Sequence, residues 1–199
     1  MKAYLNLNRV LERTRAEGPG WRFCIWTQGC LQRCVSCCNA TMQELRPEIL
    51  VPVQELCQRL EETCRKFPLE GVTFLGGEPF LQARNLIPVA QCAHSLGMSV
   101  MAFSGYELAF LRSGTLPGTA ELLEHVDVLV DGPYIQDLPD KKRNWVGSEN
   151  QKFHYLTSFY DAGIETDERF RGIVEMRFEP LEIAINGCPK TLSETVFHG

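Results

Sequence analysis

Cys30, Cys34 and Cys37 stand in one short segment at the spacing C-x3-C-x2-C, which is the most informative feature of the chain. Three thiolates within eight residues can hold three irons of a [4Fe–4S] cluster. The fourth iron then has no protein ligand, and an open position on a metal centre is where a substrate can bind and react. Gly29, before the first cysteine, permits close approach of backbone amides to the cluster. The spacing therefore predicts a cluster with one open iron.

A structural zinc site is the rival interpretation of this segment, with Cys38, Cys24 or a histidine as fourth ligand. Zinc sites usually pair two C-x2-C units or add a histidine at a set spacing, but the chain has no second unit and its first histidine is His94. A cluster is therefore the better interpretation. Its register stays open at this point, because Cys38 continues a regular spacing with Cys30 and Cys34.

A low-potential cluster with three thiolate charges should be buried in a largely apolar site. Trp26, Leu31 and Val35 are available to surround it. The remaining cysteines call for a different explanation, since most fall at apolar positions of predicted helices or strands. We expect four of them to be small buried hydrophobes: Cys24, Cys57, Cys64 and Cys92. Cys188 stays unassigned.

A second motif, Gly76-Gly77-Glu78-Pro79, follows the apolar stretch 71–75. Two glycines let backbone carbonyls and amides approach a ligand, Glu78 can accept from an ammonium group, and Pro79 can start the next helix. A strand-to-helix connection with two glycines also occurs in many α/β proteins. The turn becomes a candidate for function because it follows the cysteine loop in the sequence.

Composition narrows the class of protein. A chain of 199 residues with 44% hydrophobic content can build one sizeable core, so we expect a single domain over residues 1–199. The net charge of −5 argues against non-specific nucleic-acid binding, and no stretch of about 18 apolar residues predicts a membrane span. Nine clustered cysteines without a signal-peptide pattern favour a reducing cytoplasm and metal ligation over disulfides.

The elements that must position these motifs alternate between strand and helix. Residues 1–8 alternate apolar and polar side chains, as an edge strand does, and the alternating units imply an α/β fold with parallel strands. The units are too few for a closed eight-stranded barrel, so we expect a partial (β/α) barrel with a curved, mostly parallel sheet and its chemistry at the C-terminal strand ends. The expected elements are a hairpin (3–10, 20–27), helices (52–67, 81–96), strands (71–75, 98–103, 126–130) and a broken helical segment (106–124).

The last third of the chain is less regular. Residues 133–171 contain proline and charged clusters and are predicted to form a long loop. Residues 172–179 and 181–185 alternate at period two, which predicts an antiparallel pair turned at Glu179-Pro180.

The two motifs, in this order and at this separation, resemble the radical S-adenosylmethionine (SAM) superfamily. Within it, several segments look like the small activating enzymes of anaerobic ribonucleotide reductase, over a core of about residues 3–151: 21–30, 37–39, 103–106, 128–133 and 145–151. The family spacing favours Cys37 over Cys38 as third ligand. Two positions depart from the pattern, since Ser36 stands where the superfamily favours an aromatic and Val146 where an arginine is expected. Residues 152–199 extend past the shortest members.

The resemblance implies a [4Fe–4S] cluster and SAM as cofactors. The open iron would chelate SAM, and Gly76, Gly77, Glu78 and Pro79 would hold its amino group. Ser104 would lie near its methionine part and Asp131 near its ribose, although each has a simpler interpretation as a turn residue or a cap. An external donor such as flavodoxin or ferredoxin would reduce the cluster, and a 5′-deoxyadenosyl radical would take hydrogen from the substrate.

In the activating enzymes that substrate is a backbone glycine of a large reductase. Because a small, partly open barrel cannot enclose a large substrate, we expect an inserted polypeptide to complete the cavity, with Trp145, Asn150 and Gln151 lining the opening. Two alternatives stay open. One is a radical SAM enzyme that modifies another peptide or a small molecule, and the other is a non-catalytic iron–sulfur protein.

Overall fold

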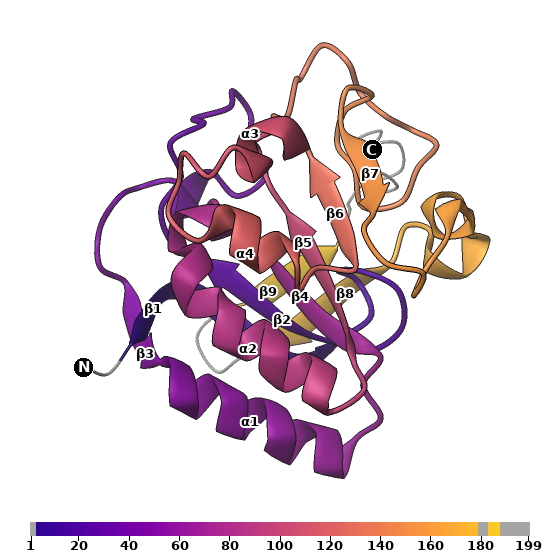
Figure 1. The fold of residues 1–199 in the computed structure, drawn as a ribbon. Helices are drawn as coiled ribbons and strands as arrows, with labels where there is room; N and C mark the ends of the chain where they lie inside the picture. The colour runs from indigo at the N-terminus through magenta and orange to yellow at the C-terminus, as the bar shows by residue number, and fades with distance from the viewer. Residues whose placement is uncertain (1–2, 179–182, 188–199) are drawn as a thin grey trace.

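The long alternating strand at the N-terminus organises the sheet of this protein, whose computed structural model describes residues 3–178 and 183–187 (Figure 1). The N-terminal strand pairs with the next strand across the turn at 15–21, as predicted. The strands of the main sheet are β1 (Tyr4–Thr14), β2 (Arg22–Thr27), β3 (Ile49–Pro52), β4 (Gly71–Gly76), β5 (Ser99–Phe103), β6 (Val128–Asp131) and β7 (Lys152–Tyr155). The helices are α1 (Val53–Lys66), α2 (Ala83–Ser95), α3 (Leu108–Arg112) and α4 (Thr119–Leu123).

The strand order is β3-β1-β2-β4-β5-β6-β7, and the four strands from β2 to β6 run parallel. The outer pairings, β3 with β1, β1 with β2 and β6 with β7, are antiparallel. The predicted α/β class with a parallel centre is confirmed, and the sheet stays open between its edges β3 and β7.

Two details of the sheet were predicted wrongly. The N-terminal strand is not an edge strand, because β3 pairs along its outer side. The expected loop over 133–171 also contains β7, which pairs with β6. Both missed strands have four residues, too few for an alternating pattern to stand out, and tertiary pairing decides their conformation.

Helix α1 illustrates why the local sequence forms these elements. Pro52 has the extended backbone of an N-cap, and Arg65 and Lys66 lie in the last turn, where cations favour the helix dipole. Its apolar side chains recur on one face, and Leu56 and Leu60 are fully buried. Helices α1 and α2 together cover one face of the sheet (Figure 1).

The two faces of the sheet carry separate apolar clusters, as the period of two along each strand requires. Toward α1 and α2 lie the large side chains of β2 and β4, among them Phe23 and Phe74. The opposite face carries Trp26 and Leu75 in one cluster and Met101 with Val130 in another. No helix in the described ranges is long and apolar enough to cross a membrane.

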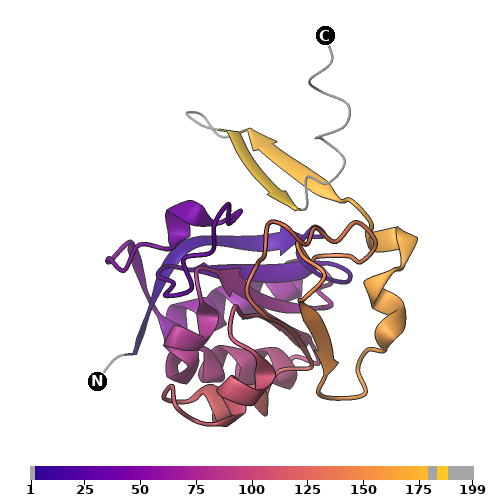
Figure 2. The same ribbon diagram turned by 90° about the horizontal axis from the view of Figure 1, so that it is seen from above.

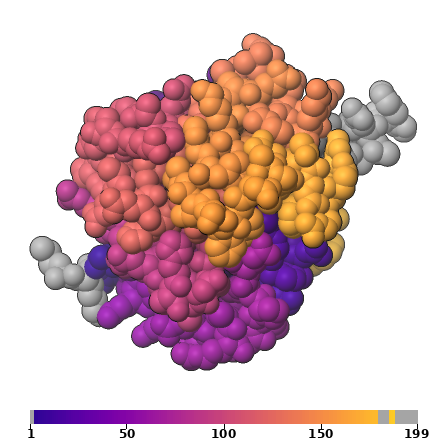
Figure 3. All heavy atoms as spheres, turned by 45° about the vertical axis from the view of Figure 1, so that its right-hand side comes forward, coloured from indigo at the N-terminus to yellow at the C-terminus, as the bar shows by residue number. Residues whose placement is uncertain are grey.

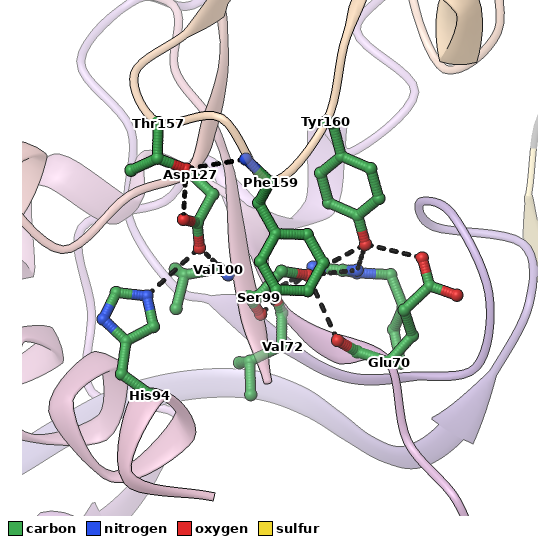
Figure 4. A network of polar contacts seen from close by, with 10 residues as sticks. Glu70, Val72, His94, Ser99, Val100, Asp127, Thr157, Phe159 and Tyr160 are labelled. Atoms are coloured by element: carbon green, nitrogen blue, oxygen red, sulfur yellow. Dashed lines mark hydrogen bonds and ion pairs between the residues drawn. The ribbon is translucent and has the colours of Figure 1, made fainter. Parts of the chain in front are cut away.

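Residues 156–173 return to this second face, where Tyr160 and Ile164 pack against the cluster of Met101, and they form a continuous layer at the surface (Figure 3). Tyr160 anchors them, since its hydroxyl donates to Glu70 Oε1 at 2.6 Å and lies 3.0 Å from Ser99 Oγ. Nearby, Asp127 accepts from Thr157 at 2.6 Å and lies 3.1 Å from His94 Nε2 (Figure 4). These contacts lie at the N-terminal ends of the parallel strands, away from both motifs.

Strands β8 (Val174–Phe178) and β9 (Ile183–Gly187) form the predicted antiparallel pair, whose turn residues lie outside the described ranges. This hairpin lies on the side of the sheet opposite to α1 and α2 (Figure 2). Glu175 accepts from the Arg15 amide at 2.8 Å, and Asn186 donates to Thr14 Oγ1 at 2.9 Å. The hairpin is thus held by the end of β1 and the turn that follows.

Candidate metal and cofactor site

The predicted site residues meet at one end of the sheet, because each follows one of four neighbouring parallel strands. The cysteine loop follows β2, and the Gly-Gly-Glu-Pro turn follows β4. Ser104 comes directly after β5, and Asp131 is the last residue of β6. The carboxyl ends of parallel strands share one edge, so the candidate residues gather there.

Backbone hydrogen bonds join the two motifs directly. The Gly77 amide donates to the Thr27 carbonyl at 2.8 Å, and the Glu78 amide donates to the Gly29 carbonyl at 2.8 Å. A Cβ atom on Gly77 would overlap the Gly29 carbonyl oxygen and lie 2.8 Å from that of Met42. The glycine at position 77 is therefore required for the turn to approach the cysteine loop.

Glu78 is buried at the centre of this junction. Its Oε1 accepts from the Phe80 amide at 3.1 Å and from Ser104 Oγ at 3.0 Å, and its Oε2 accepts from the Gly105 amide at 2.8 Å. Burial raises the pKa of Glu78 to about 7, and these three donors only partly offset the rise. No cation of the described residues contributes to this balance. The carboxylate would gain from an ammonium group beside it.

The cysteine loop turns sharply, with Arg33 at φ 50° and Ser36 at φ 55°. Cys30 is buried, and the Gln32 amide lies 3.4 Å from its sulfur, the kind of contact that stabilises a thiolate. Cys34 and Cys37 are partly exposed.

The cysteines of the loop differ in their ease of ionisation. A hydrogen bond with Cys38 lowers the pKa of Cys37 to about 6, with help from the Asn39 amide and against partial burial. Burial raises the pKa of the Cys30 thiol. Since metal ligation requires thiolates, Cys37 is the easier of the two to bring into a cluster.

The arrangement of these side chains suits a cluster better than a single ion. Within the described residues, no three His, Cys, Asp or Glu side chains are grouped so that they could hold one metal ion. A zinc site requires four ligands around one point, whereas the cysteines of a cubane bind different irons and stand around its volume. A soft, all-thiol donor set with an amide directed at Cys30 fits an iron–sulfur cluster.

Ser104 and Asp131 have structural partners in addition to any role toward a ligand. Ser104 Oγ donates to Glu78 and accepts from the Tyr106 amide at 3.0 Å. Asp131 Oδ2 accepts from the Leu108 amide at the start of α3 and lies 2.9 Å from His154 Nε2. Asp131 Oδ1 is buried without a hydrogen-bond partner among the described residues, so this acceptor is available to a ligand hydroxyl.

The expected cover of the cysteines is met only in part. Trp26 is buried, as expected, but Leu31 and Val35 are 51% and 75% exposed and do not cover the cysteines. Asn150 donates to the Pro133 carbonyl at 2.7 Å, and Gln151 accepts from the Gly147 and Ser148 amides, so these amide groups hold their own loop.

The other positions singled out in the sequence have structural roles. Val146 is buried in the cluster that contains Met101, and Trp145 packs on Phe170. Cys24 is fully buried, as predicted, whereas the helix cysteines are only partly buried: Cys57, Cys64 and Cys92. Cys188 lies outside the described residues.

Comparison with known proteins agrees with this geometry. Residues 16–154 match the family described as "4Fe-4S single cluster domain". The anaerobic ribonucleoside-triphosphate reductase-activating protein of Pasteurella multocida is 31% identical over 153 residues, which cover 72% of this chain and 92% of that protein. This chain belongs to the radical SAM activating-enzyme family. It is a radical SAM enzyme, and its cofactors are a [4Fe–4S] cluster and SAM.

Further relatives carry the same name. The activating protein of Enterobacteria phage T4 is 29% identical over 156 residues, covering 74% of this chain and 92% of its own. The activating protein of Escherichia coli K12 is 26% identical over 148 residues, which cover 70% of this chain and 92% of that protein. A crystal structure of QueE from Escherichia coli matches with a TM-score of 0.43 and 15% identity, covering 62% of this chain and 68% of that one.

Proposed function

We propose that the enzyme activates an anaerobic ribonucleotide reductase by removing a hydrogen atom from a backbone glycine of that protein, in the cytoplasm. The joining of the cysteine loop to the turn that carries the buried Glu78 supports the proposal, because cysteines suited to a cluster and a carboxyl group suited to an ammonium group then lie side by side. The printed names of the relatives support the reductase as substrate.

In this proposal Cys30, Cys34 and Cys37 hold three irons, and flavodoxin or ferredoxin supplies the electron. When bound, the cluster and SAM would supply the one-electron chemistry needed to remove the hydrogen atom. The side chains and backbone groups of the protein bind and orient SAM and exclude water.

The turn from Gly76 to Pro79 binds the amino group of SAM. Glu78 becomes its counter-ion, because Oε2 has only the Gly105 amide as donor and can accept a second one. Ser104 orients Glu78 near the methionine part, since its hydroxyl donates to Oε1. Asp131 receives a ribose hydroxyl at Oδ1, while the Leu108 amide fixes its other oxygen.

The test is anaerobic reconstitution with iron and sulfide, followed by SAM, dithionite and the candidate reductase. A doublet EPR signal on the reductase and transfer of deuterium from its glycine into 5′-deoxyadenosine are expected. Cleavage of SAM should be slow without the reductase and rise on its addition. If neither the EPR signal nor deuterium transfer appears while SAM is still cleaved, the reductase is ruled out as the substrate.

A second candidate is a radical SAM enzyme for another polypeptide or a small molecule. The family match ends at residue 154, and the layer after β7 and the hairpin β8–β9 follow it. These additions favour a substrate different from that of the short relatives. The same deuterium experiment, with other peptides or metabolites in place of the reductase, separates the two.

A further inference from the structure

Aliphatic side chains stand exposed on the cysteine loop itself. Leu31 and Val35 lie on either side of Cys34, with 51% and 75% of their surface exposed. A site that generates a carbon radical must exclude water, and the described residues leave Leu31 and Val35 uncovered.

A second loop meets the first at this place. Ser36 Oγ and Gln136 Oε1 lie 2.7 Å apart, which joins the cysteine loop to the loop after β6 across 100 positions of sequence. On either side of Gln136 stand Ile135, 37% exposed, and Leu138, 42% exposed. Both loops extend from the end of the sheet at which β6 ends (Figure 1).

We infer that Leu31, Val35, Ile135 and Leu138 form one docking surface for an apolar segment of the polypeptide substrate. This inference rests on the proposed function and names the part of the enzyme that receives the reductase. The segment would cover the accessible cysteine loop while it brings the reacting residue to the cofactors. The names of the relatives point to a protein as substrate, and a peptide segment can contact aliphatic groups on two neighbouring loops at once.

The hairpin β8–β9 offers a competing apolar surface, with Met176, Phe178 and Ile185 between 52% and 78% exposed. It is held by Thr14 and Arg15, which lie next to the start of β2, whereas the cysteine loop follows the end of β2. A substrate bound only to the hairpin would leave the cysteine loop uncovered. The loops beside the cofactor site are therefore the stronger candidate.

The experiment measures the dissociation constant for the reductase and the KM for radical formation with reconstituted enzyme. Val35→Ser and Leu138→Ser alter the two loops separately, and Phe178→Ser is the matched control, since Phe178 is 78% exposed. Iron content is measured on every variant and rates are expressed per cluster, so that loss of cofactor is recognised. Each loop variant should raise both constants about tenfold, the equivalent of 1.4 kcal/mol, while the control leaves them unchanged.

The outcomes separate this inference from the proposed function. If the wild-type enzyme activates the reductase and both loop variants keep its constants, the docking surface is wrong and the proposed function stands. If Phe178→Ser alone weakens binding, the substrate docks on the hairpin instead. If the wild-type enzyme forms no glycyl radical on the reductase, the proposed function fails, and the docking surface defined by that substrate fails with it.

Discussion

The amide of Glu78 donates to the carbonyl oxygen of Gly29 across 2.8 Å, and this bond joins a turn after β4 to the loop after β2. The two strands pair in parallel up to Thr27 and Gly76, so the bond continues their register by two more residues. It holds the cysteine that follows Gly29 beside the carboxylate of Glu78. The proposed cluster site and the proposed ammonium site thus share this junction, and changes at the junction should affect both.

Gly77→Ala should destabilise the fold and lower cluster content together. The added methyl group would overlap the Gly29 carbonyl oxygen, which is backbone and cannot rotate away. Overpacking of this kind costs about 1–3 kcal/mol. Urea unfolding and iron analysis on the same preparations test this, and normal values in both would mean that the junction can open without cost.

Glu78 should make stability depend on pH. Its pKa is raised to about 7 from an ordinary 4.5, so the folded state holds a proton that the unfolded state has lost between these values. The sign is then fixed: stability falls as pH rises from 4.5 to 7, by about 3 kcal/mol in total for the SAM-free protein. The unfolding free energy of wild type minus that of Glu78→Gln should decrease across this window. A flat difference would show that Glu78 is already ionised at the lower pH.

The same carboxyl group should link SAM binding to proton release. An ammonium group beside Glu78 favours the carboxylate, so binding below pH 7 displaces a proton, and affinity should rise with pH up to about 7. Calorimetry in buffers of different ionisation enthalpy measures the number of protons released when SAM binds. Glu78→Gln should keep the cluster, bind SAM more weakly and release no proton. Proton release that persists in this variant would assign it to another group.

Cluster content should depend on three of the four cysteines in the loop. Replacing Cys30, Cys34 or Cys37 by alanine should abolish the cluster, and Cys38→Ala should retain about four irons per chain. Cys38 is exposed and supports Cys37 through a hydrogen bond, which a ligand can replace. Iron and sulfide analysis with EPR of the reduced protein tests the register. Loss of iron in Cys38→Ala together with its retention in Cys37→Ala would reverse the assignment.

Tyr160→Phe should loosen the layer of chain after β7. The hydroxyl bonds to Glu70 and Ser99 and accepts from the fully buried guanidinium of Arg22 at 3.3 Å, so its removal deletes these hydrogen bonds, although Arg22 and Ser99 keep other partners. The expected cost is about 1–3 kcal/mol in urea unfolding. Tyr4→Phe, at an exposed position, is the control and should be neutral. An equal effect of both variants would mean that the network contributes nothing specific.

The local chemistry of the site could be predicted from residues close together in sequence. The spacing of Cys30, Cys34 and Cys37, the Gly-Gly-Glu-Pro turn and the strand and helix periods all depend on neighbours, and the elements around α1, α2 and β4 appear where the periods indicate. Parallel strands then bring their carboxyl ends to one edge, so the grouping of the two motifs also followed from the pattern, whereas Ser104 and Asp131 were added by the family resemblance.

Only the tertiary structure decided how these groups contact one another. Three of these contacts join residues between 26 and 100 positions apart in the sequence. They are the packing of Gly77 on backbone, the bonds of Glu78 to Ser104 and Gly105, and the contact of Ser36 with Gln136. The exposure of Leu31 and Val35 shows the same limit, because apolar character alone does not say whether a loop finds something to pack against. Spacing encodes which chemistry the chain can perform, whereas contacts at long range, which no local pattern records, determine where that chemistry is open to a partner.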